Sequence, residues 1–137
     1  MKVHVPVRVR YKETDAMGIV HHSNYYVWFE LARCAFVEKL GYSYRRIEED
    51  GVFFAVIETQ CRYKEPARFE DELDIVVWVE EVKGVRCRFG YQVLREDRLL
   101  AEGSTLHCAL DRSLKPINMG KTHPDMWKRF QECAEQQ

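Results

Sequence analysis

The chain has 137 residues, of which 46% are hydrophobic and 31% are charged, and this balance is typical of one globular domain over residues 1–137. Its net charge of −1 argues against general binding of nucleic acid or of a membrane surface, because there is no excess of positive charge. No apolar run approaches the about 20 residues that cross a bilayer, and the N-terminal residues alternate instead of forming a signal sequence, so we expect a cytoplasmic protein without membrane insertion.

Alternating apolar residues predict five strands. The first covers residues 3–11, and four more lie at about 53–64, 70–82, 85–95 and 98–110. Two residues separate each of the last three segments from the next, Lys83-Gly84 and Glu96-Asp97, which is typical of hairpins in an antiparallel sheet. In the last segment the apolar residues change face near Thr105, and we expect a bulge there.

Residues 24–40 predict a long helix, which Gly41 would end. Apolar side chains cover nearly its whole circumference, so the helix must be buried on almost all sides. The strip with Glu30 and Arg33 should be the least buried stripe, or the place where a partner subunit packs. A shorter helix is predicted at about 43–50, and a last one at about 124–134, where a proline suits the first turn.

One strand, a buried helix and four further antiparallel strands together predict an α+β fold. A single short sheet can bury the helix only by curling around it. Such a sheet leaves an exposed edge strand, a liability that proteins usually remove by pairing, so we expect a homodimer with joined edge strands.

The segment between the first strand and the long helix, residues 11–25, combines features that suit acyl transfer. Asp15 supplies a carboxylate beside Gly18, which allows a tight reversal of the chain. Paired histidines then lead into Ser23 and Asn24, both good N-cap residues. The helix N-terminus offers free backbone N–H groups and a partial positive charge, which can polarise a carbonyl or hold an oxyanion.

This stretch, YKETDAMGIVHHSNYYVWFELAR, resembles the signature of the 4-hydroxybenzoyl-CoA thioesterase-like family of hotdog-fold proteins. In particular it is similar to the short-chain acyl-CoA thioesterases associated with the Tol–Pal envelope system of bacteria. Residues 63–73, YKEPARFEDEL, also match, so the resemblance covers about residues 3–120. It implies a five-stranded antiparallel sheet wrapped around a long central helix, and hydrolysis of a short-chain or aromatic acyl-CoA to free acid and CoA.

The resemblance also implies roles for individual residues. Asp15 matches the catalytic aspartate, which acts as a nucleophile or as a general base for water. His22 matches the position whose backbone N–H polarises the thioester carbonyl, and Tyr11 matches a tyrosine that lines the same site. Three more residues of the motif are expected to contact the substrate: Val20, His21 and Asn24. The family also implies tetramers built from the dimers.

Because CoA carries phosphates, the entrance to the site should be basic, and Lys83 and Arg86 are the candidates for contacting them. No cofactor is expected, since CoA is part of the substrate. The five cysteines are an odd number with wide spacing, which favours reduced thiols over disulfides or a zinc site. Histidines outside the motif lack metal-ligand spacing, so no metal is expected.

Two alternative functions stay open. Hotdog dehydratases act on 3-hydroxyacyl thioesters with a histidine and an acidic residue on the helix, and His21 or His22 with Glu30 superficially offers that pair. The other alternative is a protein that binds acyl thioesters without turnover, or an accessory protein of an envelope complex.

Overall fold

The computed structural model describes residues 1–136 and contains five strands and four α-helices. In chain order the elements are β1 (Val3–Arg8), the 3-10 turn η1 (Tyr11–Glu13), α1 (Ser23–Lys39), α2 (Tyr44–Glu49), β2 (Phe53–Tyr63), β3 (Glu72–Lys83), β4 (Arg86–Arg95), β5 (Arg98–Leu110), α3 (Met119–Thr122) and α4 (Pro124–Glu135).

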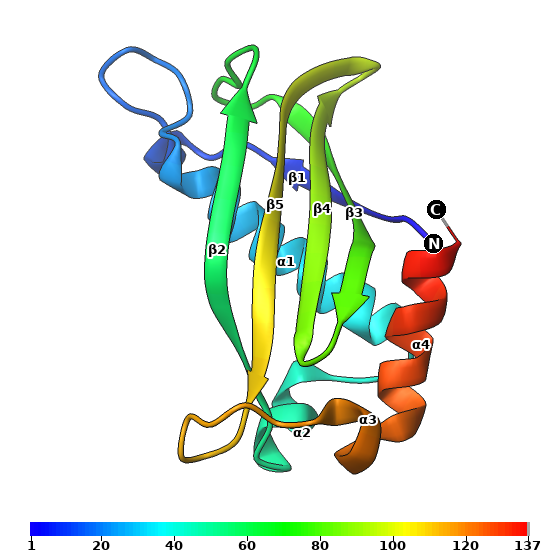
Figure 1. Ribbon diagram of the computed structural model, residues 1–137. Coiled ribbons are helices and arrows are strands. Elements are labelled where there is room, and N and C mark those ends of the chain that lie inside the picture. Colours follow the sequence, from blue (N-terminus) through cyan, green and yellow to red (C-terminus); the bar gives the residue numbers. More distant parts are fainter. Residues whose placement is uncertain (137) are drawn as a thin grey trace.

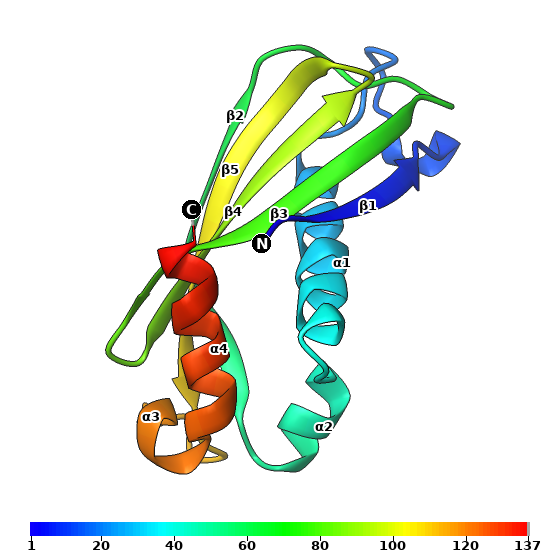
Figure 2. The same ribbon diagram turned by 90° about the vertical axis from the view of Figure 1, so that its right-hand side faces the viewer.

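All five strands form one antiparallel sheet in the order β1-β3-β4-β5-β2, so β1 and β2 are its two edges. The long helix α1 lies on one face of this twisted sheet (Figure 1, Figure 2). The α+β fold with a sheet wrapped on a central helix, which the sequence predicts, is therefore confirmed.

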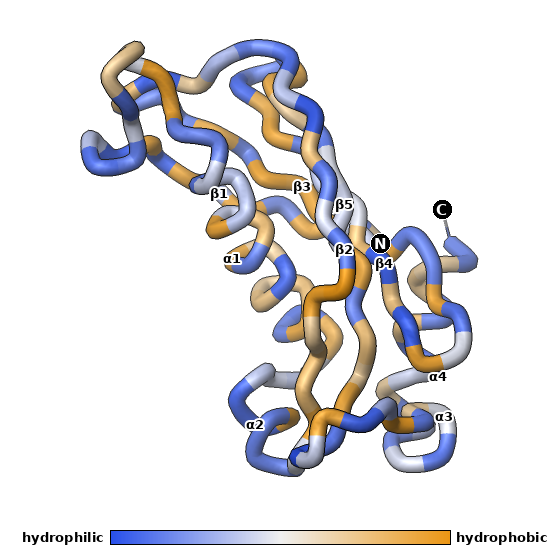
Figure 3. Tube along the Cα trace, turned by 60° about the vertical axis from the view of Figure 1, so that its left-hand side comes forward, coloured by the Kyte–Doolittle hydropathy of each residue, from blue (hydrophilic) through white to orange (hydrophobic). Residues whose placement is uncertain are grey.

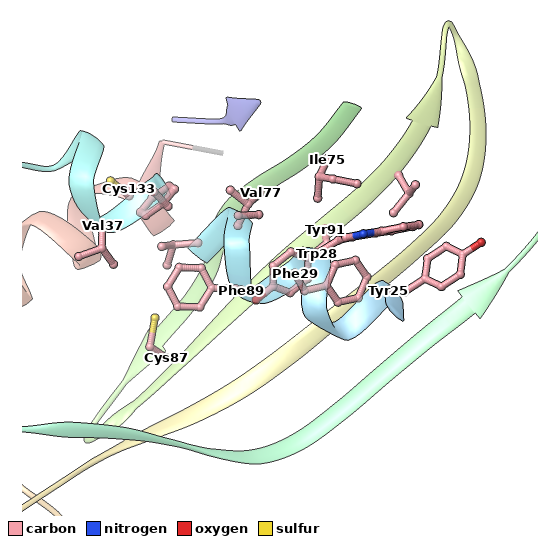
Figure 4. Packing of buried hydrophobic residues seen from close by; sticks show 14 of the residues in the cluster. Tyr25, Trp28, Phe29, Val37, Ile75, Val77, Cys87, Phe89, Tyr91 and Cys133 are labelled. Atoms are coloured by element: carbon pink, nitrogen blue, oxygen red, sulfur yellow. The ribbon is translucent and has the colours of Figure 1, made fainter. Parts of the chain in front are cut away.

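The core lies between that face of the sheet and α1. Trp28, Phe29 and Phe36 of α1 are fully buried, and Phe29 stacks on Tyr91 of β4 with ring centroids 4.1 Å apart (Figure 4). Burial of each such aromatic side chain stabilises the fold by roughly 1.5–3 kcal/mol. Phe130 of α4 packs against Phe36 and so closes the core near the C-terminal end of α1.

Hydrophobic residues also reach the surface, on β2 and on α1. Figure 3 shows hydrophobic residues in orange over the first half of β2, where Val56 and Ile57 are half-exposed. Val27 and Leu31 are half-exposed too, because each lies two residues from buried Phe29 and so on the opposite side of α1. The prediction that α1 is buried on almost all sides is therefore wrong for the single chain.

The strip expected to be least buried on α1 also differs from the prediction. Glu30 is exposed, but Arg33 is only partly so. Its guanidinium turns inward and donates a hydrogen bond to the hydroxyl of Tyr91 at 3.1 Å. Arg33 is therefore partly buried because Tyr91 on β4 provides a hydrogen-bond partner beneath the helix. The pattern of residues along the helix does not reveal this partner.

The first strand ends earlier than the alternation predicts. β1 stops at Arg8, and the chain then enters η1, where the Glu13 side chain accepts a hydrogen bond from the Arg10 backbone N–H at 2.7 Å. Tyr11 continues the apolar pattern of the strand, yet it is 76% exposed because this turn rotates it out of the sheet.

The two hairpin turns and the bulge lie close to their predicted positions. The turn between β4 and β5 is at residues 96–97, as predicted, whereas Lys83 pairs with Arg86 and moves the other turn to residues 84–85. The irregularity predicted on β5 lies on its neighbour β2, after Val56. The apolar residues of β5 change face because residues 104–109 are buried on both sides of the sheet.

Candidate active site

The loop before α1 is a small hairpin that presents Asp15. Thr14 and Val20 form an isolated β-bridge, and the Asp15 backbone N–H donates to the Ile19 carbonyl at 2.9 Å. Gly18 closes the turn with a φ of +78°, which lies in the left-handed region that glycine adopts without strain. The reversal that the sequence predicts at Gly18 is therefore present.

The carboxylate of Asp15 is held by this turn and is half-buried. Its Oδ1 accepts a hydrogen bond from the Met17 backbone N–H at 2.8 Å. This contact fixes the side-chain rotamer, and within residues 1–136 no protein group donates to the second oxygen, Oδ2. Asp15 thus has one anchored oxygen and one that is available to attack a carbonyl or to accept a proton from water.

The N-terminus of α1 is arranged differently from the predicted cap. The helix begins at Ser23, and its first amide donates to Nδ1 of His21 at 3.2 Å, so His21 takes the capping role expected of Ser23 or Asn24. The Asn24 side chain instead donates to the Glu13 carbonyl at 2.9 Å. In the part of the chain that the structure describes, the amide N–H of His22 donates to no protein group, and it remains a free donor at the positive end of the helix dipole.

A pocket of about 350 Å³ brings the two halves of this arrangement together. Asp15, Val20 and His22 line it from the loop, Tyr25 from α1, and Tyr63 and Pro66 from the end of β2 and the residues that follow. Of the residues implied by the motif, Asp15, Val20 and His22 therefore share one pocket.

Tyr63 also lines the candidate pocket, although the sequence pattern did not predict it. Its hydroxyl donates to the His22 carbonyl at 3.3 Å, and its ring makes an edge contact with Tyr25 at 4.9 Å. Burial, and then the hydrogen bond with Cys61, raise the pKa of the Tyr63 hydroxyl, so it stays protonated and keeps its role as a donor. The only sequence signal was its position as the first residue of the family-like stretch 63–73.

The other predicted residues lie outside the pocket. Tyr11 packs edge-on against Phe69 at 5.5 Å and does not line it, and His21 and Asn24 hold the loop to the helix. Lys83 and Arg86 line a separate pocket of about 440 Å³ at the β3–β4 hairpin, at the end of the sheet away from the Asp15 loop (Figure 1).

A cluster of three polar side chains, Tyr91, Thr105 and His107, is buried beneath α1 and does not line the pocket. The Tyr91 hydroxyl and Thr105 Oγ1 are 2.6 Å apart, and Nε2 of His107 lies 2.7 Å from the same Oγ1. Burial, with the nearby Arg33 charge, lowers the pKa of His107 to about 3. His107 is therefore a neutral core residue.

Among residues 1–136, no group of three or more His, Cys, Asp or Glu side chains is placed to hold a metal ion. No helix of the described chain is both long and apolar enough to cross a membrane.

The sheet wrapped on a central helix is the hotdog fold. The structure of a DHNA-CoA thioesterase from Staphylococcus aureus matches it with a TM-score of 0.92 and 28% identity, over 98% of this chain and 94% of that one. The model of the Thioesterase-like superfamily matches residues 9–126. The chain belongs to this superfamily.

Two relatives are similar over most of their length. YneP of Bacillus subtilis (strain 168) is 35% identical over 130 residues, which cover 93% of this chain and 94% of that protein. The acyl-CoA thioester hydrolase YbgC of Escherichia coli O157:H7 is 31% identical over 119 residues, which cover 85% of this chain and 89% of YbgC. The class of enzyme predicted from the sequence, a thioester hydrolase, agrees with this family and with the name of YbgC.

Proposed function

We propose that the chain is an acyl-CoA thioesterase that hydrolyses short-chain or aromatic acyl-CoA esters to the free acid and CoA. The observation that carries the proposal is that Asp15, which has one oxygen without a protein donor, and His22, which has a free backbone amide, line the same pocket. The amide donor would polarise the thioester carbonyl and stabilise the oxyanion that develops on it. Asp15 would attack that carbonyl or activate a water molecule.

An aromatic acyl group suits the walls of the pocket. The rings of Tyr25, Tyr63 and His22 lie around it, and aromatic rings favour edge-to-face and offset contacts with one another. The similarity to the DHNA-CoA thioesterase supports the same class of substrate. The narrower relation to the Tol–Pal-associated branch stays a prediction from the motif.

We also propose that the active unit is a dimer joined through β2. The edge strand β1 has six residues and carries Pro6, which removes one backbone donor, whereas β2 has eleven residues and no proline. Half-exposed Val56 and Ile57 add apolar surface to the β2 edge. Because the pocket lies beside the end of β2, the second copy would border the site, and further packing could give a tetramer.

In such a dimer Lys83 and Arg86 would lie near the candidate active site of the other copy, whereas in the single chain they lie far from their own. A two-fold axis perpendicular to the sheet makes the paired strands antiparallel, so the hairpin end of one sheet lies beside the Asp15 end of the other. We therefore keep these two residues as contacts for CoA phosphates in the site of the second copy.

A panel of acyl-CoA esters tests the reaction. We expect release of free thiol, with the fastest turnover among aromatic and short-chain esters. Tight binding across the panel without thiol release would instead indicate a non-catalytic binder. Enoyl absorbance formed from a 3-hydroxyacyl thioester would indicate the dehydratase, for which His21 or His22 with Glu30 was the candidate pair.

A further inference from the structure

Glu13, two positions before Asp15, makes several hydrogen bonds to which the proposed reaction assigns no role. Glu13 is a carboxylate with only 2% of its surface exposed. One oxygen accepts a hydrogen bond from the Arg10 backbone N–H at 2.7 Å. The other accepts from the Arg10 guanidinium and from the indole N–H of Trp28, each at 3.2 Å.

Its backbone carbonyl makes a second set of contacts. It accepts a hydrogen bond from the His21 N–H at 2.8 Å and another from the Asn24 side chain at 2.9 Å. Glu13 therefore joins the start of the Asp15 loop, the end of that loop and the first turn of α1. His21 directly precedes His22, so these bonds fix the free amide donor as well as the carboxylate.

We propose that Glu13 is a positioning residue, whose buried carboxylate sets the distance between Asp15 and the amide N–H of His22. This inference rests on the proposed function, because it assigns Glu13 an effect on the reaction through Asp15. Three donors converge on the carboxylate from two directions, the η1 turn and α1. A misplacement of reacting groups by about 1 Å can cost about 100-fold in rate, so a rigid anchor here affects the chemical step.

The charge of Glu13 is part of the anchor. Burial raises the pKa of this carboxyl, but the hydrogen bonds from the Arg10 side chain and backbone and from Trp28 outweigh it, so its pKa lies below the ordinary value. Glutamine has the same shape but only one acceptor oxygen. In Glu13→Gln the amide N–H₂ must face donors from Arg10 or Trp28, and the loop has to shift.

The test compares Glu13→Gln with wild type in steady-state hydrolysis of a good acyl-CoA ester. We expect kcat to fall about 10- to 100-fold while KM stays within about two-fold, because the substrate still binds but meets a misplaced carboxylate. Ile47→Val or Ile47→Ala, whichever matches the thermal midpoint of Glu13→Gln, is the control, since Ile47 is buried on α2 and lies outside the pocket. It should keep the wild-type kcat.

A double-mutant cycle then separates positioning from a purely structural role. If Glu13 acts through Asp15, adding Glu13→Gln to Asp15→Asn lowers kcat no further. A loss that adds in full, or a Glu13→Gln enzyme with wild-type kcat, would overturn the inference. A fully active Asp15→Asn enzyme would overturn the proposed function instead, whatever Glu13 does.

Trp28→Phe covers the case in which Glu13→Gln does not fold. It keeps an aromatic ring near Tyr25 and removes the indole donor to Glu13, together with part of the buried ring volume. We expect kcat to fall at unchanged KM, as for Glu13→Gln, but by a smaller factor. An unchanged kcat in this variant would contradict the positioning role.

Discussion

At the scale of the residue, His107 in the buried cluster beneath α1 makes the stability of the fold depend on pH. Its folded pKa of about 3 lies below the ordinary histidine value, because burial and the Arg33 charge oppose protonation. At pH values between these two pKa values, the histidine is protonated in the unfolded chain but neutral in the folded chain. This contribution to stability is therefore complete above about pH 6.5 and is lost as the pH falls.

The His107→Leu variant tests that sign. We expect the free energy of unfolding of the wild type to fall by about 1.4 kcal/mol per pH unit more steeply than that of the variant between about pH 6 and pH 4. Urea denaturation at several pH values measures both slopes. Equal slopes would show that His107 is protonated without cost in the folded protein.

A glycine gives the second prediction at this scale. A Cβ added to Gly103 on β5 would lie 2.5 Å from the Gln60 carbonyl oxygen and 3.1 Å from the Phe29 ring. Both neighbours are fixed, one as backbone and one in the core, so Gly103→Ala should lower the free energy of unfolding by about 1–3 kcal/mol. Thermal and urea denaturation check this.

Gly18→Ala is the matched comparison, because a Cβ there meets no atom within 4 Å. Only the left-handed backbone opposes it, at a cost of about 1–2 kcal/mol. Its effect should appear mainly as a lower kcat, since Gly18 shapes the Asp15 loop. A Gly103→Ala protein as stable as wild type would mean that β5 and β2 shift apart freely.

At the scale of the element, the sequence predicted the strands and the helix whose apolar residues repeat at a regular spacing. The strands at β2 to β5 and the helix α1 were predicted within about two residues, because their apolar residues repeat with the period of a strand or of a helix. The end of β1 was not, since Tyr11 continues the alternation while a contact between Arg10 and Glu13 turns the chain away. Such a side-chain contact leaves no period in the sequence.

The same reasoning explains which parts of the site were predicted. Asp15, Val20 and His22 belong to one continuous motif, so the pattern that predicts one predicts all three. Tyr63 enters the pocket from β2, forty-one positions after His22, and only the folded sheet brings it there. In the proposed dimer Lys83 and Arg86 would border the site of the second copy, and a single sequence reveals only their charge.

At the scale of the whole molecule, Ile57→Asp tests the proposed dimer. Ile57 is 47% exposed in the single chain, so the change should cost little stability in a monomer. In a dimer it would bury a charge at the β2 edge, and we expect the variant to sediment as a monomer with reduced turnover. Sedimentation velocity at micromolar concentration measures this.

Leu114→Asp serves as its control, because Leu114 is 72% exposed and lies in the loop after β5, not on β2 itself. It should keep the sedimentation coefficient and the activity of the wild type. If Ile57→Asp also sediments like wild type, or if the wild type is a monomer at this concentration, the β2 dimer is excluded.

The central claim is that the Asp15 carboxylate, in the pocket that it shares with His22, carries out thioester hydrolysis. The most direct test is kcat of Asp15→Asn on the best acyl-CoA ester, followed by free-thiol release with the binding of CoA measured in parallel. Asparagine keeps the shape but removes both the nucleophile and the base, so we predict that kcat falls at least about 100-fold while CoA binding is unchanged. Turnover equal to that of the wild type would contradict the account.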